Sequence, residues 1–89
     1  MNYNEYLPQT IEQAVGVLLE QLPAGEKHKI AAMLRDDLIN LHFGLGTSIR
    51  NDFGLWSGNT ALLESTGNSH PDDAAMAIIA ALWHRLNNA

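Results

Sequence analysis

The chain has 89 residues, of which 46% are hydrophobic and 17% charged, a balance that excludes intrinsic disorder and suits one domain spanning residues 1–89. It has no cysteine, which excludes disulfides, thiolate metal ligands and cysteine nucleophiles. Ten acidic residues against five scattered basic ones give a net charge of −5, so direct binding of nucleic acid is not expected.

The N-terminal residues, "MNYNEYLPQT", have neither the basic start nor the apolar run of a signal peptide. No window approaches the roughly 18 consecutive apolar residues that a membrane-spanning helix needs. Residues 1–9 are therefore expected to form an extended segment of a cytoplasmic protein that does not enter a membrane.

The first helix is expected over residues 10–22. Thr10 is a typical N-cap, and Gln13 three residues later completes a capping box. Apolar residues then recur at intervals of three and four, as on one face of a helix; they are Ile11, Ala14, Val15, Leu18, Leu19 and Leu22. The "PAG" triplet at 23–25 ends this helix.

A second helix is expected over residues 26–50, with apolar residues on two opposite sides. One stripe consists of Ile30, Leu34, Leu38, Leu41 and Leu45, and the other of Ala32, Ile39, Phe43 and Gly46. Because this pattern is apolar on both sides, we expect the helix to lie at the centre of the fold, with part of its second face covered by a partner subunit. Gly44 and Gly46 cost about 1 kcal/mol each in a helix relative to alanine, so we expect a kink or a close helix contact there.

Two further helices are expected, over residues 60–65 and 71–87. Asn59 can cap the first of them and Gly67 can end it. The last helix has Pro71 at its first position, followed by two aspartates in the turn where the helix dipole favours negative charge. No alternating β-branched run occurs, so the predicted fold is all-α, a small orthogonal bundle of four helices.

The residues that could carry chemistry do not form a recognisable catalytic or metal-binding motif. No two of the four histidines have the i, i+4 spacing of a helical zinc site, and no serine lies in a nucleophile elbow. Asp36 and Asp37 are adjacent, so their side chains point apart on a helix. We therefore expect no catalytic residue, no metal ion, no cofactor and no enzymatic activity.

The octapeptide "IRNDFGLW" at 49–56 places three polar residues among large apolar ones. A buried Arg50 needs an anionic partner, and we expect Asp72 or Asp73 at the start of the last helix, where His70 acts as the cap. Asn51 is expected to bind loop amides, and Trp56 to close the bundle floor with Phe53 and Leu55. The alternative is a small-ligand or metal site; its residues would be Arg50, Asn51, Trp56, His70, Asp72 and Asp73.

The segments "LHFGLGTSIRNDFGLW" and "HPDD", followed by an "AxxIIxALWxRL" tail, resemble a family of small uncharacterised bacterial proteins. The matching positions are Gly46, Ile49, Arg50, Asn51, Gly54, Leu55, Trp56, His70, Pro71, Asp72 and Asp73. The resemblance covers about residues 38–86, which leaves the first helix outside it. It implies a bacterial origin, one small helical domain and a pairing of the two motifs, but no activity.

Size and acidity favour a non-enzymatic protein that binds another protein, most simply an immunity or antitoxin protein. Its carboxylates would take the place of phosphates on a basic toxin, for example a nuclease. The expected partner contacts are Glu12, Glu20, Glu26, Asp36 and Glu64. Two alternatives remain, namely the ligand or metal site described above and a structural homodimer through the second face of residues 26–50.

Overall fold

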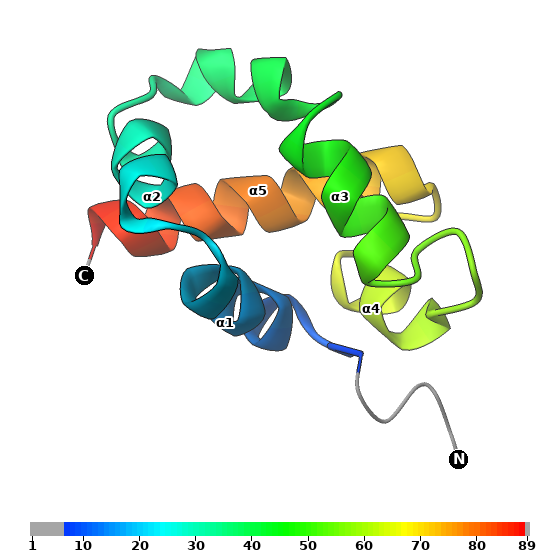
Figure 1. Ribbon diagram of the computed structural model, residues 1–89. Helices are drawn as coiled ribbons and strands as arrows, with labels where there is room; N and C mark the ends of the chain where they lie inside the picture. The colour runs from blue at the N-terminus through cyan, green and yellow to red at the C-terminus, as the bar shows by residue number, and fades with distance from the viewer. Residues whose placement is uncertain (1–6, 89) are drawn as a thin grey trace.

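The computed structural model describes residues 7–88, and within that range the chain is helical and has no strand. Six helical segments follow one another (Figure 1): α1 (Ile11–Gln21), α2 (Ala24–Ala31), η2 (Arg35–Leu41), α3 (Leu45–Asp52), α4 (Thr60–Ser65) and α5 (Pro71–Asn87). The predicted all-α class is confirmed, whereas the predicted number of four helices is wrong. Residues 1–6 of the predicted extended segment 1–9 lie outside the described range.

The central element is α5, which packs against α1, α2, η2 and α3 (Figure 1). Five of its side chains are fully buried: Ala74, Ala75, Ile78, Ile79 and Leu82. The expectation that residues 26–50 would form the central helix was therefore wrong. With 17 residues α5 is the longest of the described helices, none of which combines the length and hydropathy needed to cross a membrane.

Residues 26–50 form three segments because the helix breaks twice. Leu34 is extended (φ −76°, ψ 151°) between α2 and the 3₁₀ helix η2, and Gly44 (φ −94°, ψ −90°) leaves the helical region before α3. The buried stripe nevertheless survives in part, since Ile30 and Leu38 are buried and Leu41 is half-buried. The helical spacing of the apolar residues therefore continues through both breaks, so this spacing alone does not show where the helix is interrupted.

The predicted second apolar face of residues 26–50 does not exist as one covered surface. Ile39 is 60% exposed and Phe43 is 86% exposed. Gly46 is buried instead, and a Cβ atom at this position would lie 3.2 Å from Arg50 Nη1 and 3.8 Å from Ile79 Cδ1. Both expectations for the glycines thus hold, because Gly44 interrupts the helix and Gly46 allows a close contact with α5.

One hydrophobic core joins the elements. Its buried members are Ala14, Val15, Leu18, Ile30, Leu38, Ile49, Phe53, Leu55, Leu62, Ala74, Ala75, Ile78, Ile79 and Leu82. The first three come from α1, and their burial confirms the predicted stripe on that helix. At its start, Thr10 Oγ1 accepts a hydrogen bond from Gln13 N–H (3.1 Å), while Gln13 Oε1 accepts one from Gln9 N–H (2.8 Å).

Asn59 does more than cap α4 as predicted. Its Oδ1 accepts a hydrogen bond from Leu62 N–H (3.4 Å), and its Nδ2 donates to the carbonyls of Pro8 (2.8 Å) and Phe53 (2.7 Å). Because Asn59 is buried, these bonds satisfy polar groups that water cannot reach. The side chain thereby ties the segment before α1 to the end of α3, and Gly67 (φ 74°) follows α4 as expected.

Candidate functional site

Arg50 joins α3 to the first turn of α5, as the sequence predicts. Its side chain is 8% exposed, and its Nε lies 3.3 Å from Asp72 Oδ1. Its Nη2 donates to the His42 carbonyl (3.2 Å) and to Thr47 Oγ1 (3.0 Å). Asp73 is exposed and forms no ion pair within the described residues, so the predicted pairing is made by Asp72.

His70 caps α5, also as predicted. Its Nδ1 accepts a hydrogen bond from Asp72 N–H (3.1 Å). The edge of the Trp56 ring system lies against the imidazole, with ring centroids 5.6 Å apart. The two motifs of the sequence thus meet at a joint between α3, the following loop and α5.

Two of the residues predicted for this site have other positions than expected. Trp56 is 57% exposed and does not close the bundle floor, although Phe53 and Leu55 are buried as predicted. Asn51 is exposed, and its side chain forms no hydrogen bond within residues 7–88. The loop carbonyls are bound by Asn59 instead, whose second role has no separate signal in the sequence.

Arg50 Nη1 is buried without a hydrogen-bond partner, and a Cβ atom at Gly46 would lie 3.2 Å from it. Three hollows of the described surface are not lined by Arg50, His70 or Asp72. Nor do three histidine or acidic side chains gather in residues 7–88 as a metal ion would require. The contacts of Arg50 and His70 connect α3, the loop that follows it and the first turn of α5.

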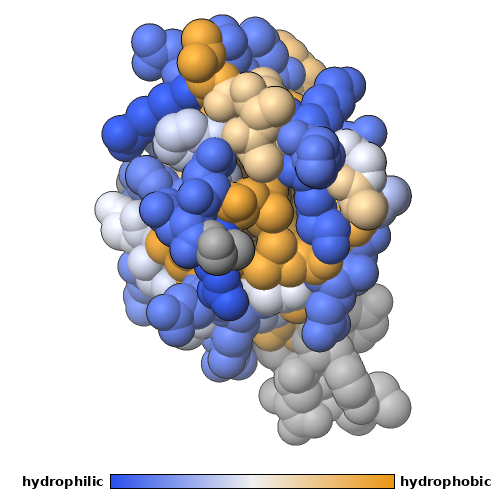
Figure 2. Space-filling view, turned by 90° about the vertical axis from the view of Figure 1, so that its left-hand side faces the viewer, coloured by the Kyte–Doolittle hydropathy of each residue, from blue (hydrophilic) through white to orange (hydrophobic). Residues whose placement is uncertain are grey.

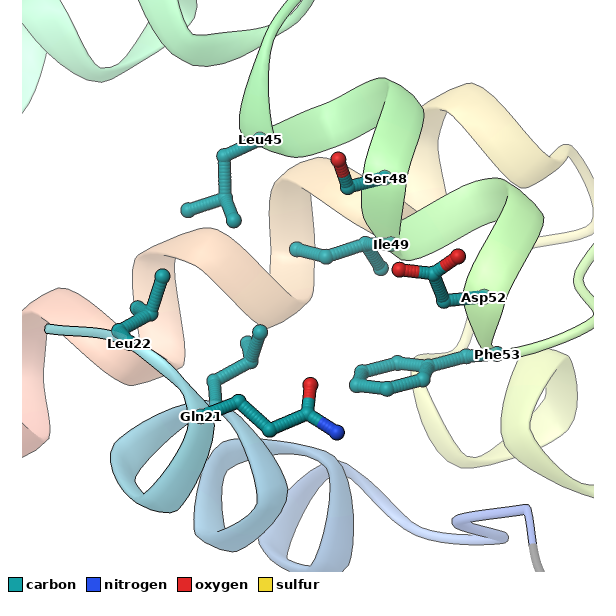
Figure 3. A pocket seen from close by; sticks show the side chains of 8 residues that line it. Gln21, Leu22, Leu45, Ser48, Ile49, Asp52 and Phe53 are labelled. Atoms are coloured by element: carbon teal, nitrogen blue, oxygen red, sulfur yellow. The ribbon is translucent and has the colours of Figure 1, made fainter.

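A groove lies beside this joint, between α1 and α3 (Figure 3), with a volume of about 220 Å³. Its apolar lining consists of Leu18 of α1 and the C-cap residue Leu22 on one side, and of Leu45 and Ile49 of α3 and the C-cap residue Phe53 on the other. The residues of each side are four positions apart, which places them on one face of the helix and its end. The apolar rows of two helices therefore form the two walls.

Three polar side chains stand at the edge of this groove: Gln21, Ser48 and Asp52. Figure 3 shows Asp52 extending from α3 above Phe53, and Gln21 extending from α1 toward the Phe53 ring. All three residues are exposed, and their side chains form no hydrogen bond or ion pair with the rest of the described chain. The groove thus combines apolar walls with polar side chains that form no hydrogen bond or ion pair within the described chain.

Large apolar side chains are exposed along residues 34–43, which we call the 34–43 segment. Leu34 is 71%, Ile39 60% and Phe43 86% exposed. Two carboxylates, Asp36 and Asp37, are exposed in the same segment. The segment is an uncovered apolar and acidic surface.

The other acidic residues predicted as partner contacts are also exposed, but they are spread over several elements. Glu12 and Glu20 belong to α1, Glu26 to α2 and Glu64 to α4. Figure 2 views the end of the molecule where the C-terminus lies, and there hydrophobic side chains are surrounded by hydrophilic ones. The exposed acidic residues predicted as partner contacts are therefore spread over α1, α2, η2 and α4 and are not confined to one helix.

A family model described as a domain of unknown function (DUF6794) matches residues 7–86. The match includes α1, so the expectation that the first helix lies outside the family was wrong. No curated protein and no solved structure matches the chain. From residue 7 to residue 86, the chain belongs to the family of this domain of unknown function, DUF6794.

Proposed function

We propose that the chain is a non-enzymatic protein of the immunity or antitoxin type, which binds and neutralises a basic toxin. The observation that carries the proposal is the exposed 34–43 segment. Single exposed apolar residues are ordinary on protein surfaces, but here three large ones lie within ten residues. Side chains of this kind act as anchors when an interface buries them.

The charge of the chain supports a basic partner. The net charge is −5, and Asp36 and Asp37 adjoin the exposed apolar residues. Opposite charges on two partners accelerate their association and disfavour wrong partners. A toxin that acts on nucleic acid has basic side chains that bind phosphate groups, and carboxylates of an inhibitor can form ion pairs with the same side chains. The acidic residues of α1, α2 and α4 add to the long-range attraction of a basic partner.

The type of protein is tested by co-expression. Each gene that neighbours the coding sequence is expressed in a heterologous host, alone and together with this chain. We expect one neighbour to stop growth and the chain to restore it. If no neighbouring product is toxic, or if the chain rescues none, the immunity or antitoxin assignment is wrong.

The binding surface is tested with the partner found in this way. The variant Ile39→Ser/Phe43→Ser removes two exposed side chains and is expected to fold normally. It should weaken binding by about 2 kcal/mol or more, as the loss of anchor residues does, measured by isothermal titration calorimetry. The comparison variant Trp56→Ser removes an exposed aromatic side chain from the IRNDFGLW octapeptide, outside the 34–43 segment, and should bind the partner with unchanged affinity. The opposite pattern would place the binding surface at the IRNDFGLW and HPDD motifs.

A further inference from the structure

We infer that the groove between α1 and α3 is a binding site for an organic ammonium ion carried on an apolar body. This inference is independent of the 34–43 segment and of the toxin assignment. It is based on three features of the groove, namely its size, its uncommitted polar groups and its charge.

The size of the groove limits the class of ligand. Its volume is about 220 Å³, below the roughly 300–1,000 Å³ of sites for drug-sized molecules and cofactors. The floor is formed by the apolar residues Leu45, Ile49 and Phe53 on one side and by Leu18 and Leu22 on the other. A single ring or a short alkyl chain fits this space.

The polar groups at the edge specify what the ligand carries. Ser48 and Asp52 are four residues apart on α3, so they form a polar row beside the apolar row of Leu45, Ile49 and Phe53. The carboxylate and hydroxyl can both accept from an N–H group, and the Gln21 carbonyl can accept from the side of α1. An ammonium ion has three donors and no acceptor, so all three groups can accept from it; Ser48 and Gln21 can also donate, and the acceptor-only carboxylate of Asp52 is what favours a cation.

The position of Asp52 strengthens the inference. It is the last residue of α3, where the helix dipole disfavours a negative charge. No basic residue within the described chain forms an ion pair with it, and it is the one charged residue in the lining of the groove. A cation in the groove would supply the missing partner. The functional group of "IRNDFGLW" is then Asp52, while Arg50 is structural.

The inference is tested by NMR titration of the ¹⁵N-labelled full chain with phenethylammonium chloride and, separately, with its neutral analogue 2-phenylethanol. The amide shifts should be concentrated at Leu18, Leu22, Leu45, Ile49 and Phe53. Because Asp52 is exposed, we expect the ammonium ion to bind about threefold to fivefold more tightly than the alcohol. Shifts that fall outside the groove, or equal affinities for the two probes, would overturn the inference.

Three variants test whether Asp52 and the groove are the cause of the preference for the ammonium ion. Asp52→Asn should abolish the preference for the ammonium ion and leave thermal stability unchanged or raised, because it removes a charge from the wrong end of a helix. Asp73→Asn removes one negative charge from an exposed position outside the groove and should keep the preference. If both variants lose it equally, the effect comes from net charge alone and the site is refuted. Ser48→Phe, at an exposed position of the lining, should block both probes.

The same ammonium group can come from a free amine or from a lysine side chain of a partner protein. A third titration therefore uses Nα-acetyl-lysine methylamide. Tighter binding of this compound than of phenethylammonium assigns the groove to a protein side chain, and weaker binding assigns it to a free amine. If neither compound shifts the groove residues, the inference is wrong.

Discussion

At the scale of single residues, Arg50 is the side chain on which the arrangement of α3 and α5 depends most. Its interactions are unequal, since Asp72 is 41% exposed, whereas the bonds to the His42 carbonyl and Thr47 are partly buried. An exposed carboxylate regains water when its partner is lost. A buried carbonyl that loses its donor does not.

We therefore expect Arg50→Met to lower the free energy of unfolding by about 1–3 kcal/mol, whereas Asp72→Asn should lower it by at most about 1 kcal/mol. The methionine keeps the apolar stem of the side chain, so the difference reports the lost hydrogen bonds and ion pair. Urea unfolding followed by circular dichroism measures both variants. An Arg50→Met protein as stable as the wild type would contradict the structural role.

The sequence predicts two kinds of residue contact correctly. One is the helix cap, which depends on neighbouring residues, and the other is the pairing of a buried charge with an opposite charge. Thr10, Asn59 and His70 are caps because a polar side chain stands just before a helical pattern. Arg50 finds Asp72 because a buried guanidinium needs an anion. The prediction that Trp56 is buried was wrong. A loop has no regular spacing of apolar residues, so the sequence does not show which of its side chains face the core.

At the scale of elements, η2 is held by few buried side chains. It is a seven-residue 3₁₀ helix with one buried side chain, Leu38. Runs of 3₁₀ helix longer than three or four residues are uncommon because their hydrogen-bond geometry is poor. Few buried apolar contacts also mean a low free energy of local opening. The exposed 34–43 segment is therefore the part most able to adapt to a partner.

This argument predicts fast hydrogen exchange in η2. Its amides should exchange at least about 100-fold faster than those of the buried turns of α5, where opening requires most of the unfolding free energy. The eight-residue helix α3 is the matched comparison, because it has nearly the same length but buries Gly46, Ile49 and Arg50. Exchange in η2 as slow as in α3, measured by NMR or mass spectrometry, would contradict the assignment.

The breaks at Leu34 and Gly44 show why the element boundaries were harder to predict than the helical class. The leucines of the stripe keep their helical spacing through both breaks, so periodicity alone reports one helix. A glycine destabilises a helix relative to alanine, and the chain can respond either with a close helix contact at the glycine or with a break in the helix. Gly46 makes a close contact and Gly44 breaks the helix. Which of the two occurs depends on the neighbouring elements.

At the scale of the whole molecule, the groove could not have been predicted. It exists because α1 and α3 lie on neighbouring parts of α5 without closing on each other (Figures 1 and 3). Leu18 and Leu22 were assigned to a buried stripe from sequence, and Asp52 received no role. Their proximity depends on the packing of helices more than 20 residues apart in the chain.

The net charge of −5 predicts the oligomeric state. Two copies that approach through the 34–43 segment bring Asp36 and Asp37 of each copy together, and the overall charges repel. We therefore expect a monomer at micromolar concentration and low ionic strength, measured by size-exclusion chromatography with light scattering. A dimer that Phe43→Ser dissociates would instead show that the segment binds a second copy, and the surface would then be unavailable to a toxin.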